Sequence, residues 1–491
     1  MNKLEEMGLH VLYKLNWFNA VVVTNADSSL LAKVVELPFV SSFEEGMNKC
    51  CEWLNQKEPE AKPIAKASMK LIRHNCGIRR YDYGRASNQI NMLNANVLHN
   101  LGYDGAGIHI AVIDAGFFHV NKLPSFDSLW ANNQILGIRD FVDFDTIVFE
   151  SDYHGMKVLS AIGGNMPGSL VGTAPKASFY LLRSEDASTE FQIEEANWAA
   201  AVQFADSVGV QLVNTSLGYN DFDDNQQDYT YSDMNGRSAI SSLAAEMAAH
   251  KGILVVNSAG NSGGNSWRYI TSPADAKYIL TVGAVDGYGN YSNFSSRGPT
   301  YDNRIKPDVV AKGSLTAVSS HYRGVSADFG TSFSSPVMTG AVASFWQAHP
   351  ELNNFEVIEA ITRSAHQYLS PDEYFGYGIP DFALANLFPN GLAFSEFGSF
   401  NKHSNNHTAT DYFFADNDDT EFQKQLVHVE LYDITNRLLY KNETELYYSN
   451  SDQQIIPGIK ALPGGIYMMK VSTDNNTYEI RLFLFSDNYI Y

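Results

Sequence analysis

The sequence predicts an α/β protein with a central parallel sheet, followed by a small C-terminal β-sandwich. Apolar runs at 108–114 and 252–258 each end in a polar residue and a glycine turn, which is typical of buried parallel strands. From residue 425 onward, apolar and polar residues alternate with a period of two in short segments, which favours an antiparallel β-module. The two patterns predict two folded parts of different classes.

The composition and charge fit a globular protein. With 491 residues, the chain has room for one large domain of about 300 residues plus smaller ones. It is 44% hydrophobic and 18% charged, which argues against a disordered chain. A net charge of -21 disfavours nucleic acid and anionic membranes as partners, because both need clustered basic residues. No uncharged apolar run of about 18 residues is present, so we expect no transmembrane segment.

Two candidate site residues follow the predicted strands. Asp114 closes the first run and would lie at a carboxyl end of the parallel sheet, where open α/β sheets bind their ligands. Asn261 follows the second run, where its side-chain amide could donate to an oxyanion. Taken alone, each residue has a simpler role: Asp114 as a helix N-cap and Asn261 as a turn residue.

Two further candidates begin predicted helices. Small and apolar residues at helical spacing follow His154, and a similar run at 337–346 follows Ser332. We therefore expect Ser332 at a helix N-terminus, where unpaired N–H groups and the helix dipole stabilise a developing oxyanion. Pro336 is expected in the first turn of this helix. Taken alone, His154 would be a surface or capping residue and Ser332 a simple N-cap.

Together these segments carry a family resemblance. The catalytic residue types occur in the order Asp, His, Asn, Ser, within the segments 112–116, 154–155, 259–261 and 330–336. This set resembles the subtilisin-like serine proteases, and the match covers residues 82–388. The resemblance implies a three-layer fold around the parallel sheet. It also implies a serine endopeptidase that hydrolyses peptide bonds in proteins and peptides.

The resemblance assigns a role to each matching residue. Ser332 would be the nucleophile, His154 the general base and then acid, and Asp114 the carboxylate that orients His154. Asn261 would form the oxyanion hole with the backbone N–H of Ser332. An extended substrate would lie against the strand formed by Ser216, Leu217 and Gly218. Ser258, Ala259 and Gly260 would form the far wall of the first specificity pocket. Thr271 would lie near the floor of this pocket.

Three positions depart from the family pattern. Ala115 stands where a threonine or serine is usual, and Met156 and Lys157 stand where threonine and then histidine are usual. None of these changes removes a group that transfers a proton, so they bear on substrate preference and rate. The alternative from another functional class is a non-catalytic surface protein that uses a subtilase fold for binding. No cofactor is required for the expected chemistry.

The segment before the catalytic match resembles the last part of a subtilase propeptide. Residues 1–81 would then cover the active site of a zymogen, with strands expected at 17–23 and 37–40. The alternative is a short intracellular extension. The first residues carry acids in place of the apolar stretch of a signal peptide, and we expect a truncated start. All cysteines precede the match, which neither proves nor excludes export; they are Cys50, Cys51 and Cys76.

The C-terminal part predicts a linker at 389–424 and a β-sandwich at 425–491. The segments 430–433 and 462–467 resemble the sorting domain of the Bacteroidetes type IX secretion system. The lysine-rich terminus expected of that domain is absent, and a carbohydrate-binding or adhesive module is the alternative. The resemblance implies a secreted or cell-surface protein with the secretion machinery as a partner.

An acidic insertion at 220–228 follows the expected substrate strand. Clustered carboxylates and amides suit a structural calcium ion, but the spacing fits no defined calcium loop. A solvated loop is the favoured interpretation. Its position predicts that it shapes the cleft and disfavours acidic substrates.

Overall fold

The computed structural model describes residues 2–24, 30, 33–34, 36–37, 40–42, 81–386, 388, 424–433, 438–447, 465–472 and 477–484. The chain divides into a unit of residues 1–390 and a unit of residues 391–491. The first unit contains the large sheet, and the second contains a separate four-stranded sheet. The finer division into propeptide, catalytic domain, linker and C-terminal module stays a prediction.

The centre of the first unit is a seven-stranded parallel sheet with the strand order β11-β10-β9-β8-β3-β7-β4. In chain order the strands are β3 (His109–Asp114), β4 (Ile135–Asp140), β7 (Ser178–Arg183), β8 (Leu212–Thr215), β9 (Leu254–Ser258), β10 (Leu280–Val285) and β11 (Val309–Lys312). The parallel sheet predicted from the sequence is confirmed. The apolar runs at 108–114 and 252–258 are the strands β3 and β9.

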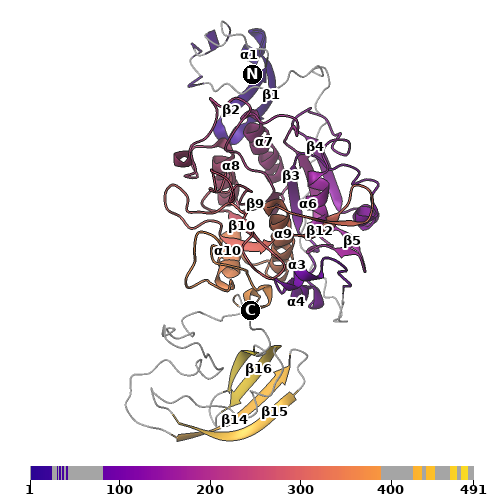
Figure 1. Ribbon diagram of the computed structural model, residues 1–491, viewed down its shortest axis with the longest axis vertical. Coiled ribbons are helices and arrows are strands. Elements are labelled where there is room, and N and C mark those ends of the chain that lie inside the picture. The colour runs from indigo at the N-terminus through magenta and orange to yellow at the C-terminus, as the bar shows by residue number, and fades with distance from the viewer. Residues whose placement is uncertain are drawn as a thin grey trace. The chain divides into compact units, whose positions relative to one another are not determined.

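Helices cover both faces of this sheet (Figure 1). One face carries α6 (His154–Gly163) and α9 (Thr331–Ala348), and the other carries α7 (Ile193–Ser207) and α8 (Ile240–His250). Ile110 and Val112 of β3 enter the core with the first pair of helices. Ala111 and Ile113 enter the core with the second pair. Burial on both faces explains the continuous apolar run, and the three-layer prediction is confirmed.

Shorter elements connect the layers. They are α1 (Asn2–Glu6), β1 (His10–Leu15), η1 (Asn16–Phe18), β2 (Ala20–Thr24), α3 (Ser87–Asn91), α4 (Ala95–Asn100), η2 (Pro124–Phe126), α5 (Asp127–Ala131), β5 (Asn165–Met166), β6 (Leu170–Val171), η3 (Tyr231–Asp233), β12 (Thr316–Ser319), β13 (Val325–Asp328), α10 (Asn354–Arg363) and α11 (Phe382–Ala385). β1 pairs with β2, β5 with β6 and β12 with β13, all antiparallel.

The hairpin of β1 and β2 packs against α7. The Tyr13 hydroxyl donates to Asn197 Oδ1 at 2.6 Å, which fixes the hairpin to the buried side of the helix. The strand expected at 17–23 is present, but it starts only at Ala20 because η1 precedes it. Of the strand expected at 37–40, only the two ends are among the described residues, and neither Leu37, which lies in a bend, nor Val40 belongs to a strand. The intervening proline has no N–H for a ladder.

The second unit contains four antiparallel strands in the order β15-β14-β16-β17. They are β14 (Lys424–Asp433), β15 (Leu438–Tyr447), β16 (Gly465–Ser472) and β17 (Thr477–Leu484). Period-two alternation predicts three of them. β15 escapes the prediction because polar residues interrupt its alternation. A second sheet, which a sandwich requires, is not among the described strands, so the sandwich itself stays a prediction.

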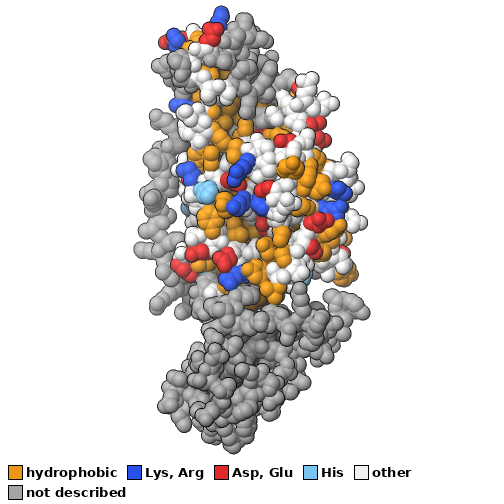
Figure 2. Space-filling view, turned by 90° about the vertical axis from the view of Figure 1, so that its left-hand side faces the viewer, with side chains coloured by type: hydrophobic (Ala, Val, Ile, Leu, Met, Phe, Trp, Pro, Cys, Tyr) orange, Lys and Arg blue, Asp and Glu red, His pale blue; other side chains and the backbone are white. Residues whose placement is uncertain are grey.

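Charged side chains of both signs are mixed on one face of the described residues. On the described part of the face shown in Figure 2, lysine and arginine side chains stand among acidic ones and do not merge into an extended basic patch. None of the described helices combines the length and the apolar character that a membrane span requires.

Candidate active site

Asp114 and His154 meet at the carboxyl edge of the sheet. Asp114 is the last residue of β3 and is fully buried, and His154 is the first residue of α6. Asp114 Oδ1 accepts a hydrogen bond from His154 Nδ1 at 2.7 Å and one from the Ala115 backbone N–H at 2.9 Å. This approach needs glycine at position 155, because a Cβ on Gly155 would stand 2.8 Å from the Asp114 Cβ. The structure thus joins two of the predicted residues.

The surroundings of His154 tune its proton affinity. Burial opposes protonation of the ring, but the Asp114 carboxylate and its hydrogen bond outweigh this effect and raise the pKa of His154 above its usual 6.5. The His154 side chain keeps 30% of its surface exposed. Its outer nitrogen, Nε2, makes no hydrogen bond to another described residue. This nitrogen is therefore open to a partner that gives up a proton.

Ser332 lies one residue inside the N-terminus of α9. Its Oγ makes a long hydrogen bond of 3.4 Å to the carbonyl of Ser216, and no hydrogen bond joins it to His154. The ring of Phe333, the next residue, has its centroid 5.9 Å from that of the His154 ring. The two predicted residues are therefore neighbours, with the serine hydroxyl turned toward the predicted substrate strand.

Pro336 lies in the second turn of α9, so the prediction that placed it in the first turn is wrong. At this position the proline has no N–H for the carbonyl four residues back, which belongs to Ser332. The Ser216 hydroxyl donates to that carbonyl at 2.9 Å and satisfies it. The proline therefore opens a contact between the helix that carries Ser332 and the strand beside it.

Asn261 is oriented by the first residue of α9. Its Oδ1 accepts from the Thr331 backbone N–H at 2.9 Å and from the Thr331 hydroxyl at 3.1 Å. Since an oxygen must face these donors, the amide leaves its Nδ2 as a donor on the other side. The Ser332 backbone N–H likewise has no hydrogen-bond partner among the described residues.

These two donors converge beside Gly330. The point where a Cβ of Gly330 would stand lies 3.6 Å from the Ser332 backbone nitrogen and 3.7 Å from both Nδ2 and Oδ1 of Asn261. Gly330 has a φ of 145°, which favours glycine, and a side chain here would approach both donors. The arrangement can stabilise an oxyanion formed next to Ser332.

The two predicted substrate segments leave adjacent strands. Residues 216–218 follow β8, and residues 258–260 close β9, its parallel neighbour. Asn257 Nδ2 donates to the Leu217 carbonyl at 3.3 Å, and the Gly260 backbone N–H donates to the Thr331 hydroxyl at 3.2 Å. Hydrogen bonds at both ends thus connect the segment around residues 258–260 to residues 216–218 and to α9.

Thr271 lies between these segments. A Cβ on Gly218 would collide with Thr271 Oγ1, and a Cβ on Gly260 would stand 3.2 Å from it. Thr271 is 3% exposed, and its Oγ1 has no hydrogen-bond partner among the described residues. The two glycines make room for Thr271. Its place near a pocket floor stays a prediction.

The departures from the family pattern have visible consequences. Lys157 forms an ion pair of 2.6 Å with Asp328 on β13 and so lies outside the Asp114–His154 contact. Asp114 Oδ2 is buried without a hydrogen-bond partner among the described residues. The neighbouring Ala115 carries no hydroxyl that could satisfy it. The carboxylate is therefore held through one oxygen.

Comparison with known proteins identifies the family. The model of the subtilase family matches residues 105–378, more than half of the chain. This chain belongs to the subtilase family. Subtilisin E of Bacillus subtilis is 28% identical over 294 residues, which cover 59% of this chain and 68% of the relative. The subtilisin of Bacillus pumilus is 27% identical over 294 residues, covering 59% of this chain and 94% of the relative.

Solved structures include MycP1 with its N-terminal propeptide removed. It is 26% identical to this subtilase, and the match covers 61% of this chain and 96% of the MycP1 chain, with a TM-score of 0.48.

Sequence reasoning misses one group of acids near this site. Glu185, Glu190 and Glu194 place carboxylate oxygens within 4.8 Å of one another. The sequence does contain a signal for buried acids here, because Glu194 and Glu195 directly precede a run of small apolar residues. In the structure both glutamates lie in one helix and are buried. In the predicted insertion at 220–228, some acidic side chains form hydrogen bonds within the loop. For example, Asp228 Oδ1 accepts from the Phe222 backbone N–H at 2.7 Å. A calcium ion in that insertion stays a prediction.

Proposed function

We propose that this subtilase is a serine endopeptidase that cleaves proteins through an acyl-enzyme on Ser332. The observation that carries the proposal is the hydrogen bond between Asp114 and His154 beside the helix N-terminus that holds Ser332. Family membership supports the same activity. Protein or peptide substrates follow as the partners of the site.

The proposed first step is attack by Ser332 on the scissile carbonyl. When substrate binds, the Ser332 hydroxyl turns from the Ser216 carbonyl toward His154 Nε2, a rotation about one side-chain bond. The proton passes to Nε2 as the Oγ–carbon bond forms. Asp114 accepts from Nδ1–H and stabilises the charged ring. The oxyanion receives hydrogen bonds from Asn261 Nδ2 and the Ser332 N–H.

The proposed second step releases the products. His154 gives its proton to the leaving amine, which breaks the C–N bond and leaves an ester on Ser332. Water then attacks the ester with the same histidine as base, and the hydroxyl of Ser332 is restored. No cofactor enters either step.

The segments around the site support an extended substrate. We infer that the peptide backbone pairs with Ser216, Leu217 and Gly218, and that one side chain enters between this strand and residues 258–260. Thr271 would form the floor of that pocket. The contacts of Gly218 and Gly260 with Thr271 support the assignment.

We also infer that the protein is a secreted or cell-surface zymogen. Residues 1–81 would act as its own propeptide, a proposal supported by the hairpin that packs against α7. The C-terminal unit would serve export, with the type IX secretion machinery as its partner. Its antiparallel strands are compatible with such a module. N-terminal sequencing of the protein recovered outside the cells tests the processing step, which predicts a start after residue 81.

Labelling by a fluorophosphonate probe tests the proposed nucleophile. The wild type should be labelled and should hydrolyse casein, whereas Ser332→Ala should lose both activities, by about a million-fold in rate as in subtilisin. Ser334→Ala is the matched control, because Ser334 lies in the same turn and its hydroxyl donates to the Thr331 carbonyl. Equal labelling of Ser332→Ala would contradict the assignment. An unlabelled but folded wild type would favour the non-catalytic binding protein.

A further inference from the structure

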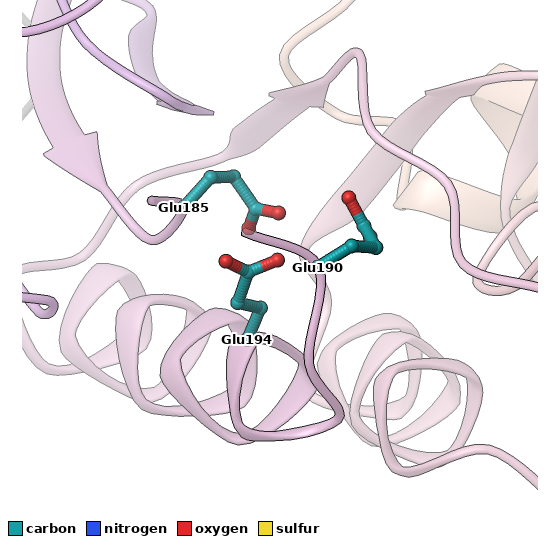
Figure 3. A group of neighbouring side chains, drawn as sticks. All are labelled: Glu185, Glu190 and Glu194. Atoms are coloured by element: carbon teal, nitrogen blue, oxygen red, sulfur yellow. The ribbon is translucent and has the colours of Figure 1, made fainter. Parts of the chain in front are cut away.

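Three glutamates from different segments lie close together: Figure 3 shows the carboxylates of Glu185 and Glu194 facing each other, with Glu190 beside them. Glu185 follows β7, Glu190 lies in the next loop, and Glu194 stands in the first turn of α7. One carboxylate oxygen from each lies within 4.8 Å of the others. Glu185 and Glu194 are buried, and Glu190 is half-buried. The group is thus closed on one side and accessible on the other.

One member of the group has an unsatisfied oxygen. Glu194 is 2% exposed, and its Oε1 accepts from the Asp186 backbone N–H at 3.1 Å. Its Oε2 is buried and has no hydrogen-bond partner among the described residues. Leaving a buried carboxylate oxygen unpaired is costly, so this atom indicates a missing partner. Figure 3 shows the carboxylate of Glu194 turned toward that of Glu185.

Among the described residues, no basic side chain forms an ion pair with the three carboxylates. The guanidinium of Arg183, two residues before Glu185, pairs with Asp140 at 2.7 Å and with Asp143. It gives only its Nε–H to the Glu185 backbone carbonyl, at 3.2 Å. Carboxylates this close together in a largely buried group repel one another. An external positive charge would remove this repulsion.

We propose that Glu185, Glu190 and Glu194 bind a calcium ion. Calcium prefers carboxylate oxygens at 2.3–2.6 Å, so two ligands on opposite sides of the ion stand about 5 Å apart, which matches the spacing of this group. Magnesium demands shorter and more regular contacts, and zinc favours nitrogen and sulfur ligands. Water can complete the coordination on the accessible side beside Glu190.

The ion would stabilise the far end of the predicted substrate strand. Tyr219 follows Gly218 directly, and its buried hydroxyl donates to Glu185 Oε1 at 2.7 Å. The backbone of Tyr219 pairs with Ser272 in both directions, at 2.8 and 3.1 Å. Ser272 is the neighbour of Thr271, so one chain of contacts leads from the glutamates to the pocket floor. Calcium would thereby order the substrate strand without taking part in the chemistry.

Calcium titration of the full-length Ser332→Ala variant tests the proposal without self-cleavage and independently of catalysis. After removal of metal with EDTA, calorimetry should show one calcium bound per chain. At a free calcium concentration of about a hundred times the dissociation constant, calcium should raise the melting temperature of the protein by about 5 °C. Glu194→Gln and Glu190→Gln should each weaken binding at least tenfold. Glu359→Gln is the matched control. Glu359 is an exposed residue of α10, so this variant removes one negative charge outside the glutamate group.

Three outcomes would overturn the proposal. The first is calcium binding that is unchanged in Glu190→Gln, a half-buried position where the variant is expected to fold. The second is no calcium effect together with a higher melting temperature of Glu194→Gln, which would show that a proton shared between carboxyl groups fills the gap. The third is no calcium effect together with a selective rise of KM in active Glu190→Gln for peptides that carry arginine, which would assign the group to a substrate side chain.

Discussion

Asp114 and the group of Glu185, Glu190 and Glu194 lie at the same edge of the sheet and differ in how their charge is balanced. Asp114 ends β3 and faces His154, a partner supplied by the chain itself. The three glutamates begin beyond the end of β7, the adjacent strand, and the described residues supply no cation to them. The difference teaches that burial alone does not define an acid's role. A balanced acid can orient a base, whereas an unbalanced group calls for an ion or a proton.

The largest expected effect comes from removing the balanced acid. Asp114→Asn keeps the shape of the side chain but presents an amide to His154, which favours the wrong tautomer of the ring. We expect kcat to fall by about 10⁴-fold with the fold retained. Steady-state kinetics on a peptide ester, with circular dichroism as the folding control, measures the loss. A loss below tenfold would contradict the role of Asp114 as the orienting residue.

A smaller loss is expected at the oxyanion donor, where a neutral group acts on developing charge. Asn261→Ala removes Nδ2 and should lower kcat by about 10² to 10³, the range found for such a donor in a subtilisin, with little change in KM. Thr331 loses its acceptor in the same variant, so the melting temperature is measured as well. An equal rise of KM would indicate a role in substrate binding. Calcium should not restore the lost rate.

The pH dependence of hydrolysis sharpens the comparison further. Catalysis needs neutral His154, so kcat/KM should fall as the pH drops through a midpoint above 6.5. In Asp114→Asn the midpoint should move to lower pH. The stabilising His154–Asp114 interaction has the opposite dependence: it is fully present below pH 6.5 and is lost as the pH rises through the raised pKa. A wild-type midpoint well below 6.5 would show that burial outweighs the carboxylate.

The smallest expected effect concerns Tyr219, which joins the glutamates to the substrate strand. Tyr219→Phe removes the hydroxyl that donates to Glu185 and should lower the free energy of unfolding by about 1 kcal/mol. KM should rise two- to threefold, by our estimate from the loss of one hydrogen bond, while kcat stays unchanged. Tyr231→Phe, which loses a hydrogen bond to the Pro299 carbonyl, is the control. Equal KM values in the two variants would break the proposed link.

The residues that sequence analysis could predict stand where regular structure begins or ends. Asp114 closes an apolar strand, and His154 and Ser332 open helices whose periodicity is clear. Such positions follow from local patterns, and the parallel sheet brings them to one edge. The direction of the Ser332 hydroxyl does not follow, because it depends on the carbonyl of Ser216, more than a hundred residues away.

The glutamate group could not be assembled from the sequence for a similar reason. Glu190 and Glu194 are four residues apart in the sequence, but Glu185 meets them only because the chain folds back after β7. Pro336 was misplaced because the helix starts earlier than the proline suggests. Its first residue is fixed by Asn261, which binds the Thr331 N–H from a different loop. In both cases contacts between distant segments decide the local structure.

Pro336 links the backbone of α9 to residue Ser216 from inside the core. The proline frees the Ser332 carbonyl, and Ser216 depends on that free carbonyl for its hydroxyl contact. A residue with an N–H at position 336 would offer the carbonyl a competing donor within the helix. The hydroxyl contact of Ser216 is therefore open to variation at a buried position of α9.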